Sequence, residues 1–239
     1  MTTTPPRRPT AFPPPTFFDT CLLPLLAHPP HPEPLPLARG WAVQVRGALS
    51  PSEASALVSA SEDLRFVPAS LNVRGEQLMD ARRRSGRLQV DSPSFASALW
   101  ERVRHAVPAT LQGRTALGLN ERLRVLRYQP GDSFAPHADG HWARADGTSS
   151  SLLTLLLYLN GAEDYEGGRT IFYESEDEAH AAWRAEPGAP GAPGFAVVPE
   201  EGLVLLQDQE IWHAVPMLEA GVKYVLRTEV LYAAAAGGV

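Results

Sequence analysis

The chain has 239 residues, of which 44% are hydrophobic, enough to bury a sizeable core in one large domain or two small ones. Its formal net charge of −6 argues against nucleic acid as the default partner. One cysteine, Cys21, excludes an intramolecular disulfide and is compatible with a reducing compartment. No apolar run approaches the roughly 18 residues of a transmembrane helix. Asp19 and Pro24 interrupt the one signal-like segment, so we expect a cytoplasmic protein.

Residues 1–38 are crowded with proline, as in "TTTPPRRPTAFPPPT" and "AHPPHPEPLPL". Proline lacks a backbone donor and favours extended polyproline II, so we expect no stable helix or sheet there. This composition predicts a poorly ordered tail, followed by a single domain over residues 39–239.

The first predicted elements are a strand in "GWAVQV" and a helix after it. Ser50, Pro51 and Glu53 form a helix start, with Ser50 as the N-cap and Glu53 completing a capping box. After the polar, arginine-rich segment "LNVRGEQLMDARRRSG", a strand is predicted in "RLQV". A second helix begins at Pro93, with Asp91 or Ser92 as its cap.

From Glu121 onward the pattern changes to strands. The run "SLLTLLLYLN" is nearly continuous in apolar residues and predicts a strand buried on both faces. Shorter strands follow, separated by Gly, Pro and acidic turns, which indicates a sandwich, barrel or jelly roll. Residues 174–194 are an insertion, with a short helix predicted over 176–184. The expected fold is therefore mainly β with flanking helices. The predicted strands are "RLRVLRY", "SLLTLLLYLN", "RTIFY", "GFAVV", "GLVLLQ", "WHAVPM" and "VKYVLRTEVLY".

Three potential metal ligands, His137, Asp139 and His141, occupy alternate positions in "YQPGDSFAPHADGHW". Because residues i and i+2 of a strand share a face, His137 and Asp139 can offer an imidazole nitrogen and a carboxylate oxygen to one metal ion. A His-x-Asp pair alone is a weak signal. His213, in the last group of strands, is the candidate third ligand. Two histidines and one carboxylate form the facial triad of non-haem Fe(II) oxygenases.

Lys223 is the only lysine among the 21 Lys and Arg residues of the chain. Its neighbours in "GVKYVLRTEV" are mostly apolar, which favours burial over the alternative of an exposed strand lysine. A buried ammonium group is costly unless an anion pairs with it. A dicarboxylate that binds the metal through one end would supply this anion at its other end.

The segments "LRVLRYQPGDSFAPHAD", "TLLLYLN", "GGRTIF", His213 and "GVKYVLRTEVLY" occur in the order and spacing of the 2-oxoglutarate/Fe(II) dioxygenases. The second half of the chain most resembles the prolyl 4-hydroxylase-like group of that family, although Ala214 stands where the family often has glycine. The resemblance implies a double-stranded β-helix, which is the jelly-roll core found in cupins. It also implies that His137, Asp139 and His213 hold Fe(II), and that Lys223 pairs with the distal carboxylate of 2-oxoglutarate. O2 would be the oxidant, with ascorbate a candidate reductant.

Four further residues are candidates for the site. Tyr128 resembles the family tyrosine that hydrogen-bonds the distal carboxylate. Thr154 either lines the same pocket or is an ordinary sheet threonine. Arg227 lies on the face of Lys223 and either contacts the substrate or belongs to a structural ion pair. His141 follows "ADG", where the chain turns, so we expect it behind the ligands or at the pocket mouth rather than on the metal.

These features predict a dioxygenase that hydroxylates a substrate and releases succinate and CO2. A peptide or protein is the favoured substrate, with proline first. The segment "LNVRGEQLMDARRRSGRLQV" carries Arg82, Arg83, Arg84 and Arg87. It is suited to form a flap over the iron and to bind an extended or acidic ligand. The alternatives are an oxygenase for a small molecule, a cupin-like protein that does not use 2-oxoglutarate, and a module whose metal is only structural. No nucleic-acid or membrane partner is expected, and the oligomeric state stays open.

Overall fold

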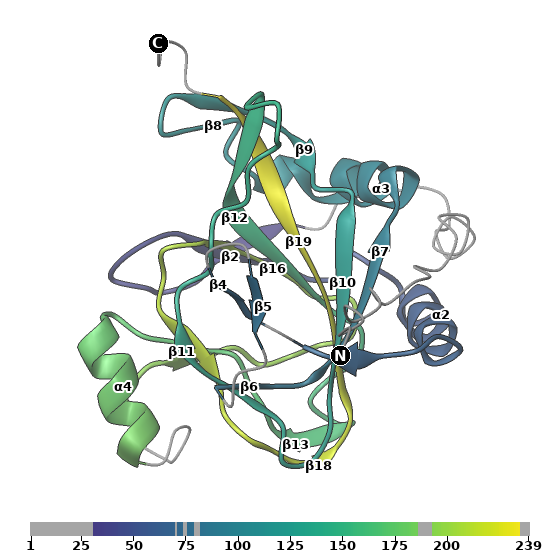
Figure 1. The fold of residues 1–239 in the computed structure, drawn as a ribbon, viewed down its shortest axis with the longest axis vertical. Helices are drawn as coiled ribbons and strands as arrows, with labels where there is room; N and C mark the ends of the chain where they lie inside the picture. Colours follow the sequence, from purple (N-terminus) through teal and green to yellow (C-terminus); the bar gives the residue numbers. More distant parts are fainter. Residues whose placement is uncertain (1–30, 70, 74–75, 79–81, 186–192, 235–239) are drawn as a thin grey trace, which may run out of the picture.

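The computed structural model describes residues 31–69, 71–73, 76–78, 82–185 and 193–234. Over these residues the fold consists of antiparallel strands in two main sheets, with helices packed on the outside (Figure 1). The predicted class, mainly β with flanking helices around a jelly-roll core, is confirmed. No described helix is long and apolar enough to cross a membrane.

The larger sheet contains ten strands within the described residues. Its central strand, β19, lies between β12 and β10, and these three strands run antiparallel to their neighbours. The strands follow the order β1 (Pro32–Pro34), β2 (Ala42–Val45), β16 (Val204–Asp208), β12 (Ser149–Tyr158), β19 (Lys223–Ala233), β10 (Arg122–Tyr128), β7 (Gly86–Asp91) and β3 (Val67–Pro68), with β9 (Arg114–Leu119) beside β19 and β8 (Thr110–Leu111) beside β9.

The smaller sheet contains five described strands and carries two of the candidate metal ligands. Its order is β15 (Phe195–Ala196), β14 (Ile171–Phe172), β17 (His213–Val215), β11 (Ser133–His137) and β6 (Arg83–Arg84). Two short ribbons complete the strands, namely β13 (Tyr165–Gly167) with β18 (Leu218–Gly221), and β4 (Leu71–Val73) with β5 (Glu76–Leu78).

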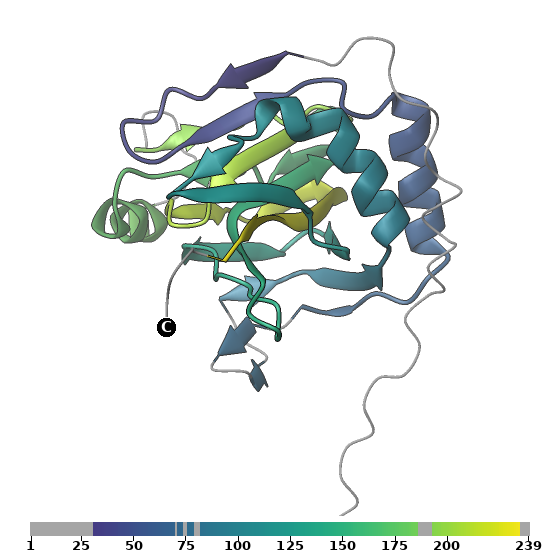
Figure 2. The same cartoon turned by 90° about the horizontal axis from the view of Figure 1, so that it is seen from above.

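Two capped helices cover the outer face of the larger sheet (Figure 2). In α2 (Pro51–Glu62) the Ser50 hydroxyl accepts from the Glu53 amide, and the Glu53 carboxylate accepts from the Ser50 amide, so the predicted capping box is present. In α3 (Pro93–Val103) Ser92, not Asp91, is the cap. A 3-10 turn, η1 (Arg104–Ala106), continues α3 toward Pro108.

Side chains alternate between the two faces of each strand, so one face packs in the hydrophobic core and the other faces the interior of the jelly roll. On β12, Leu153, Leu155 and Leu157 pack with Phe95 and Leu99 of α3 in the main core. The side chains between them face the opposite way, as the pleat requires. The predicted burial of this strand on both faces is confirmed, because all but one of its ten residues are buried.

The prediction that no sheet forms within residues 1–38 is wrong for part of that range. Residues 32–34 form the edge strand β1, which pairs with β2, and the Leu35 amide donates to the Ala42 carbonyl at 3.0 Å. Proline is tolerated at a sheet edge because its missing N–H can lie on the unpaired side. Leu35 and Leu37 also pack on a second apolar cluster. Residues 1–30 lie outside the described part of the chain.

The predicted helix in the insertion is confirmed as α4 (Glu176–Ala185), which lies beside the smaller sheet (Figure 1). Ala179 and Ala182 are buried and share a cluster with Ile171 and Ala214. Residues 186–192 of the same insertion lie outside the described residues. The helix therefore packs on the strands that carry the site.

Candidate active site

Two neighbouring strands of the smaller sheet bring the candidate ligands together. His137 is the last residue of β11 and His213 is the first of β17, and the two are cross-strand partners. Asp139 lies two residues beyond β11, where its amide donates to the Gln209 carbonyl at 2.8 Å. This hydrogen bond fixes the chain after the strand ends, so residues 74 positions apart in sequence meet at one point.

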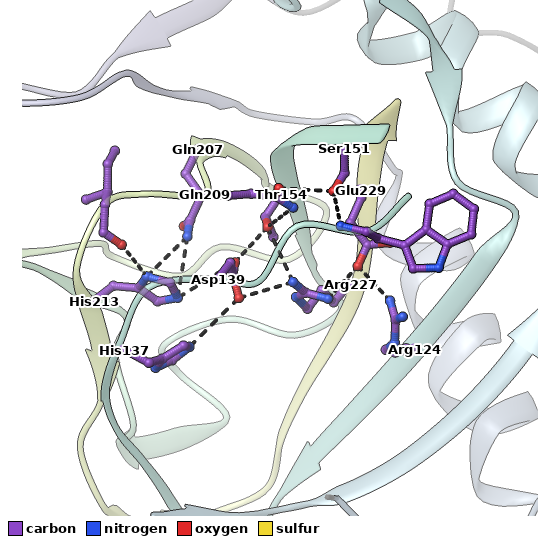
Figure 3. Close-up of polar contacts among 12 residues, drawn as sticks. Arg124, His137, Asp139, Ser151, Thr154, Gln207, Gln209, His213, Arg227 and Glu229 are labelled. Carbon is purple, nitrogen blue, oxygen red and sulfur yellow. Dashed lines mark hydrogen bonds and ion pairs between the residues drawn. The ribbon is translucent and has the colours of Figure 1, made fainter. Parts of the chain in front are cut away.

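The three side chains converge on a common space (Figure 3). His137 Nε2 lies 3.9 Å from one oxygen of Asp139, and His213 Nε2 lies 4.0 Å from the other. One ligand atom from each residue lies within 4.8 Å of the other two. Among the described residues, this is the group of His, Cys, Asp and Glu side chains that could hold a metal ion, and it does not include His141.

Backbone carbonyls orient both imidazole rings. His137 Nδ1 lies 2.8 Å from the Ala135 carbonyl, and His213 Nδ1 lies 2.9 Å from the Ile211 carbonyl. A carbonyl can only accept, so each Nδ1 carries the proton and each Nε2 keeps a lone pair. Burial also lowers the pKa of His137 well below its usual value, with His213 adding to the effect. His137 is therefore neutral, as a metal ligand must be.

Asp139 is held as a carboxylate by neighbours on the larger sheet. The Thr154 hydroxyl donates to one oxygen at 2.6 Å, and an Arg227 guanidinium nitrogen lies 3.1 Å from the other. Burial alone would raise the pKa of Asp139, but Arg227, the two histidines and Thr154 outweigh it and hold the pKa well below its ordinary range. Thr154 is fully buried and contacts Asp139 rather than the cavity wall.

Arg227 belongs to a chain of charges along the inner face of the larger sheet (Figure 3). It bonds Glu229 at 2.6 Å, and the same Glu229 oxygen accepts from Arg124 at 2.7 Å. The other Glu229 oxygen accepts from Asn120. Of the two roles that the sequence left open for Arg227, the ion pair is the one observed. Glu229 and Arg124 were not predicted from the sequence, although Glu229 follows Arg227 by two residues on β19 and Arg124 is the cross-strand partner of Arg227 on β10.

Two buried glutamines near the ligands were also missed. Gln209 accepts from the Ser151 hydroxyl at 3.0 Å and holds Asp139 through its own carbonyl. The Gln207 amide nitrogen lies 3.3–3.4 Å from the His213 ring nitrogens, and its buried Oε1 has no hydrogen-bond partner among the described residues. Neither glutamine sits in a recognisable motif, because each acts through contacts between distant strands.

Lys223 begins β19 and projects into the same interior. Only 1% of the residue is exposed, and its Nζ donates to the Gly168 carbonyl at 2.6 Å. The ammonium lies 5.4 and 5.5 Å from the ring centroids of Tyr128 and Tyr158. No carboxylate of the described residues forms an ion pair with it, and burial lowers its pKa to about 7. The preceding turn requires Gly221, whose φ is +76° and where a Cβ would meet the Asp164 carbonyl oxygen at 2.1 Å.

The predicted site residues share one cavity of about 680 Å³, with Thr154 the exception. Tyr128 is 2% exposed and lines the cavity next to Lys223, as its cross-strand partner. His141 also lines it, with Nδ1 3.2 Å from the Ser151 carbonyl. Tyr128 therefore lies beside Lys223, and His141 lies outside the convergent ligand group. The roles of both residues stay predictions.

Cationic side chains dominate the charged lining of this cavity. Seven of its lining residues are Arg or Lys and two are acidic. Three come from the arginine-rich segment expected to form a flap, parts of which (residues 74–75 and 79–81) lie outside the described residues. The cations are Arg82, Arg83, Arg87, Arg122, Arg124, Lys223 and Arg227, and the acids are Asp139 and Glu229.

The donor set fits an Fe(II) ion with a dicarboxylate co-substrate. Two neutral imidazoles and one carboxylate make a facial set that leaves coordination positions free. The buried Lys223 ammonium, with a carbonyl as its hydrogen-bond partner, suits a carboxylate. The Gln207 Oε1 without a partner leaves an acceptor for a further group beside His213.

Comparison with known proteins finds a matching family model. Residues 123–228, a little under half of the chain, match the model of the 2OG-Fe(II) oxygenase superfamily. No curated protein sequence matches the chain. The match spans β10 to the middle of β19 and contains every candidate ligand, so this part of the chain carries the features of a 2-oxoglutarate/Fe(II)-dependent oxygenase, as the sequence predicted. Fe(II) and 2-oxoglutarate are the metal and co-substrate of that family.

Solved structures share the fold at low sequence identity. A Trichoplax adhaerens prolyl hydroxylase, in complex with a peptide fragment of hypoxia inducible factor, is 17% identical over 80% of this chain and 82% of that chain, with a TM-score of 0.57. A Pseudomonas putida prolyl-4-hydroxylase is 16% identical over 81% and 94%, with a TM-score of 0.56. HygX from Streptomyces hygroscopicus, with nickel, 2-oxoglutarate and hygromycin B bound, is 17% identical over 82% and 83%, with a TM-score of 0.54.

Proposed function

We propose that the protein is a hydroxylase in which His137, Asp139 and His213 hold Fe(II). The observation that carries this proposal is the convergence of these side chains in one cavity with an ammonium group that has no carboxylate partner among the described residues. Fe(II) supplies the oxidising chemistry with O2. The protein orients the two imidazoles, keeps Asp139 ionised through Arg227 and Thr154, and limits access of water to the interior.

Lys223 pairs with the distal carboxylate of 2-oxoglutarate, and Tyr128 lies beside it. A charge-assisted hydrogen bond to a carboxylate offsets the free-energy cost of desolvating the ammonium group. A hydrogen bond to a backbone carbonyl alone offsets less of this cost. Because the cavity contains both Lys223 and the three candidate ligands, one dicarboxylate can contact both. The overall reaction converts substrate, 2-oxoglutarate and O2 into hydroxylated substrate, succinate and CO2. One oxygen atom enters the new hydroxyl group and the other enters succinate.

We infer that Arg227 is a positioning residue for Asp139 rather than a catalytic residue. It is fully occupied by two carboxylates, and burial alone would lower its pKa, whereas Asp139 and Glu229 raise it. The permanent charge keeps one Asp139 oxygen fixed while Thr154 fixes the other. This arrangement limits rotation of the carboxylate, which is the part of the site that lies outside a strand.

The substrate that we propose is a residue of a peptide or protein, with proline first. Arginines before and within β7 line the cavity beside the candidate metal ligands, which suits an extended ligand that lies across the opening. Two of the similar structures are prolyl hydroxylases, and one of these binds a peptide. HygX, with hygromycin B bound, supports the alternative of a small-molecule substrate.

Succinate formation and product mass test the proposal together. With Fe(II), O2 and 2-oxoglutarate present, we expect succinate release and a +16 Da product localised to proline in at least one peptide of a proline-rich and acidic panel. Lys223→Ala should weaken 2-oxoglutarate binding by on the order of 2–5 kcal/mol, while iron binding changes little. Undiminished succinate release in a strong chelator would contradict the metal assignment. Oxidation of a free metabolite with every peptide unchanged would favour the small-molecule alternative.

A further inference from the structure

The cavity continues past the candidate metal ligands, away from Lys223. Along β19, the lining residues that follow Lys223 are Val225, Arg227 and Glu229. Arg227 bonds Asp139, and strand geometry separates the positions of Lys223 and Arg227 by about 13 Å. A 2-oxoglutarate molecule that pairs with Lys223 at one end and binds the metal at the other occupies this stretch. The part of the cavity beyond Arg227 is therefore left for the prime substrate.

Neighbouring strands of the larger sheet form the floor of this part of the cavity. Arg227 pairs with Arg124 of β10, and Arg124 pairs in turn with Gln89 of β7. All three residues line the cavity. Two strand spacings separate Gln89 from Arg227, which is about 10 Å across the sheet. Gln89 is thus displaced sideways from the row of β19 residues that the co-substrate follows.

Gln89 differs from the charged residues in its row because its side chain has no partner within the described part of the chain. Arg124 bonds Glu229 at 2.7 Å, and Arg227 bonds both Glu229 and Asp139 (Figure 3). The Gln89 carboxamide forms no hydrogen bond or ion pair with a described residue, and it is partly buried in the cavity wall. A carboxamide offers two N–H donors and an oxygen acceptor. A ligand in the cavity can use both kinds of group at once.

Trp142 lines the same cavity and is held in place by the backbone of β12. Its amide donates to the Ser151 hydroxyl at 2.8 Å, and its carbonyl accepts from the Ser151 amide at 2.7 Å. Ser151 pairs with Leu231 of β19, two residues beyond Glu229, so Trp142 is anchored at the end of the cavity opposite Lys223. The residue is only partly buried. An indole fixed in this way offers a flat apolar surface to a ring of the ligand.

We propose that Gln89 and Trp142 are specificity-determining residues that bind the prime substrate as an extended peptide. The Gln89 carboxamide bonds the N–H and C=O groups of one residue of the peptide backbone, and the Trp142 indole packs on the proline ring. A peptide residue supplies both a donor and an acceptor, whereas a free carboxylate only accepts, and Arg124 and Arg227 already have carboxylate partners. This inference rests on the proposed function, because it assigns the recognition of the peptide within the same cavity.

Peptides with single ester bonds test the contact of Gln89. The protein is saturated with 2-oxoglutarate and Mn(II) in place of Fe(II), and the tightest-binding peptide of a proline-rich and acidic panel is titrated calorimetrically. Esters then replace its amides one at a time, which removes one backbone N–H from each probe. We expect one ester near the proline to weaken binding to the wild type about tenfold. Gln89→Ala should bind the parent peptide about tenfold more weakly, and this ester should then have little further effect.

Gln129→Ala is the matched control, because Gln129 is exposed and lies outside the cavity. It should bind the parent peptide and the ester as the wild type does. Trp142→Leu should weaken the peptide about tenfold, whereas Trp142→Phe keeps a flat ring and should retain most of the affinity. The affinity for 2-oxoglutarate should be the same in all four variants, since Lys223 is untouched, and this measurement also shows that each variant is folded.

Three results would each overturn the assignment of these residues. They are additive effects of the ester and of Gln89→Ala, equal peptide affinities of Gln89→Ala and Gln129→Ala, and no binding of any peptide to the wild type. Failure of the wild-type protein to convert 2-oxoglutarate to succinate with Fe(II) would instead contradict the proposed function.

Discussion

At the scale of single residues, the proposed pairing of Lys223 with 2-oxoglutarate predicts that binding of the co-substrate depends on pH. Its pKa is lowered to about 7 in the free protein, so the ammonium that a carboxylate needs is present below pH 7 and is lost above it. We expect the dissociation constant of 2-oxoglutarate to rise toward tenfold per pH unit above 7, with uptake of about one proton on binding. Calorimetry at pH 6 and pH 8.5, in buffers of different ionisation enthalpy, measures both quantities.

Lys223→Arg is the control, because a guanidinium stays charged over this range. Its affinity for 2-oxoglutarate should be weaker, since the side chain is larger, yet nearly independent of pH. A wild-type protein that takes up no proton at pH 8.5 would exclude Lys223 as the partner of the carboxylate.

His137 and His141, four positions apart in the sequence, are expected to respond differently to substitution by alanine. His137→Ala leaves an incomplete facial set and should abolish turnover and weaken metal binding strongly. His141→Ala should keep a substantial part of both, because its Nδ1 contacts a backbone carbonyl and it lies outside the convergent group. Equilibrium dialysis with Fe(II) or Mn(II) compares the two variants directly. Equal metal loss in both would mean that the ligand set is wrong.

At the scale of secondary-structure elements, a buried ion pair joins the two outer helices. Arg102 of α3 bonds both oxygens of Glu53 of α2, at 2.9 and 2.7 Å, and both side chains are 2% exposed. Arg102→Met leaves the carboxylate without its main partner and should lower the free energy of unfolding by about 3–5 kcal/mol. The exposed pair of Arg104 and Glu101 is the control, where Arg104→Met should cost less than about 1 kcal/mol.

The same ion pair predicts how the free energy of unfolding changes in acid. Burial alone would raise the pKa of Glu53, but bonds from Arg102 and Ser50 lower it to about 2, against an ordinary value of 4.5. A carboxylate whose pKa is lower in the folded state than in the unfolded state contributes fully to stability above its unfolded-state pKa. That contribution is lost as the pH falls through its folded-state pKa. The stability difference between wild type and Arg102→Met should therefore shrink between pH 4.5 and pH 2. Urea unfolding at several pH values checks this trend, and a constant difference would contradict it.

Elements with local signals were predictable, whereas contacts between distant elements were not. The capping box of α2 and the apolar run of β12 each follow from a short stretch of sequence, and both are present. Gln209 shows the limit: its carbonyl holds the Asp139 amide across two strands, and no local pattern encodes this contact. Thr154 shows a second limit, because strand alternation gives its face but not that Asp139 reaches it.

The strand β1 shows a third limit of prediction from sequence, because its proline-rich composition predicted that no sheet would form there. Proline counts against a sheet in general, but the penalty applies to positions whose N–H must donate, and an edge strand has few of these. Pro32 and Pro34 flank Glu33, which forms an ion pair with Arg46 beyond the end of β2. Whether a strand tolerates proline therefore depends on its position in the sheet, which only the assembled fold defines.

At the scale of the whole molecule, β1 moves the boundary of the folded domain toward residue 31. A variant that lacks residues 1–38 loses β1 and the packing of Leu35 and Leu37. Its free energy of unfolding should be about 2–3 kcal/mol lower than that of a variant that lacks residues 1–30. Denaturant unfolding of the two variants measures the difference. The full-length chain with Leu35→Ser and Leu37→Ser should show most of the same loss. Equal stability of the two truncations would return the boundary to residue 39.

The single lysine also gives the molecule a built-in chemical probe. Because Lys223 is 1% exposed and is the only lysine in the chain, an amine-acylating reagent can modify it only by entering the cavity that it lines. Burial lowers its pKa to about 7, so the amine is partly unprotonated and reactive near neutral pH, while the α-amino group serves as the reference. The rate of acylation at Lys223 then reports access to the cavity, and we expect 2-oxoglutarate with Mn(II) to slow it severalfold. The protein thus carries, without any engineering, a single-site probe for access to its own interior.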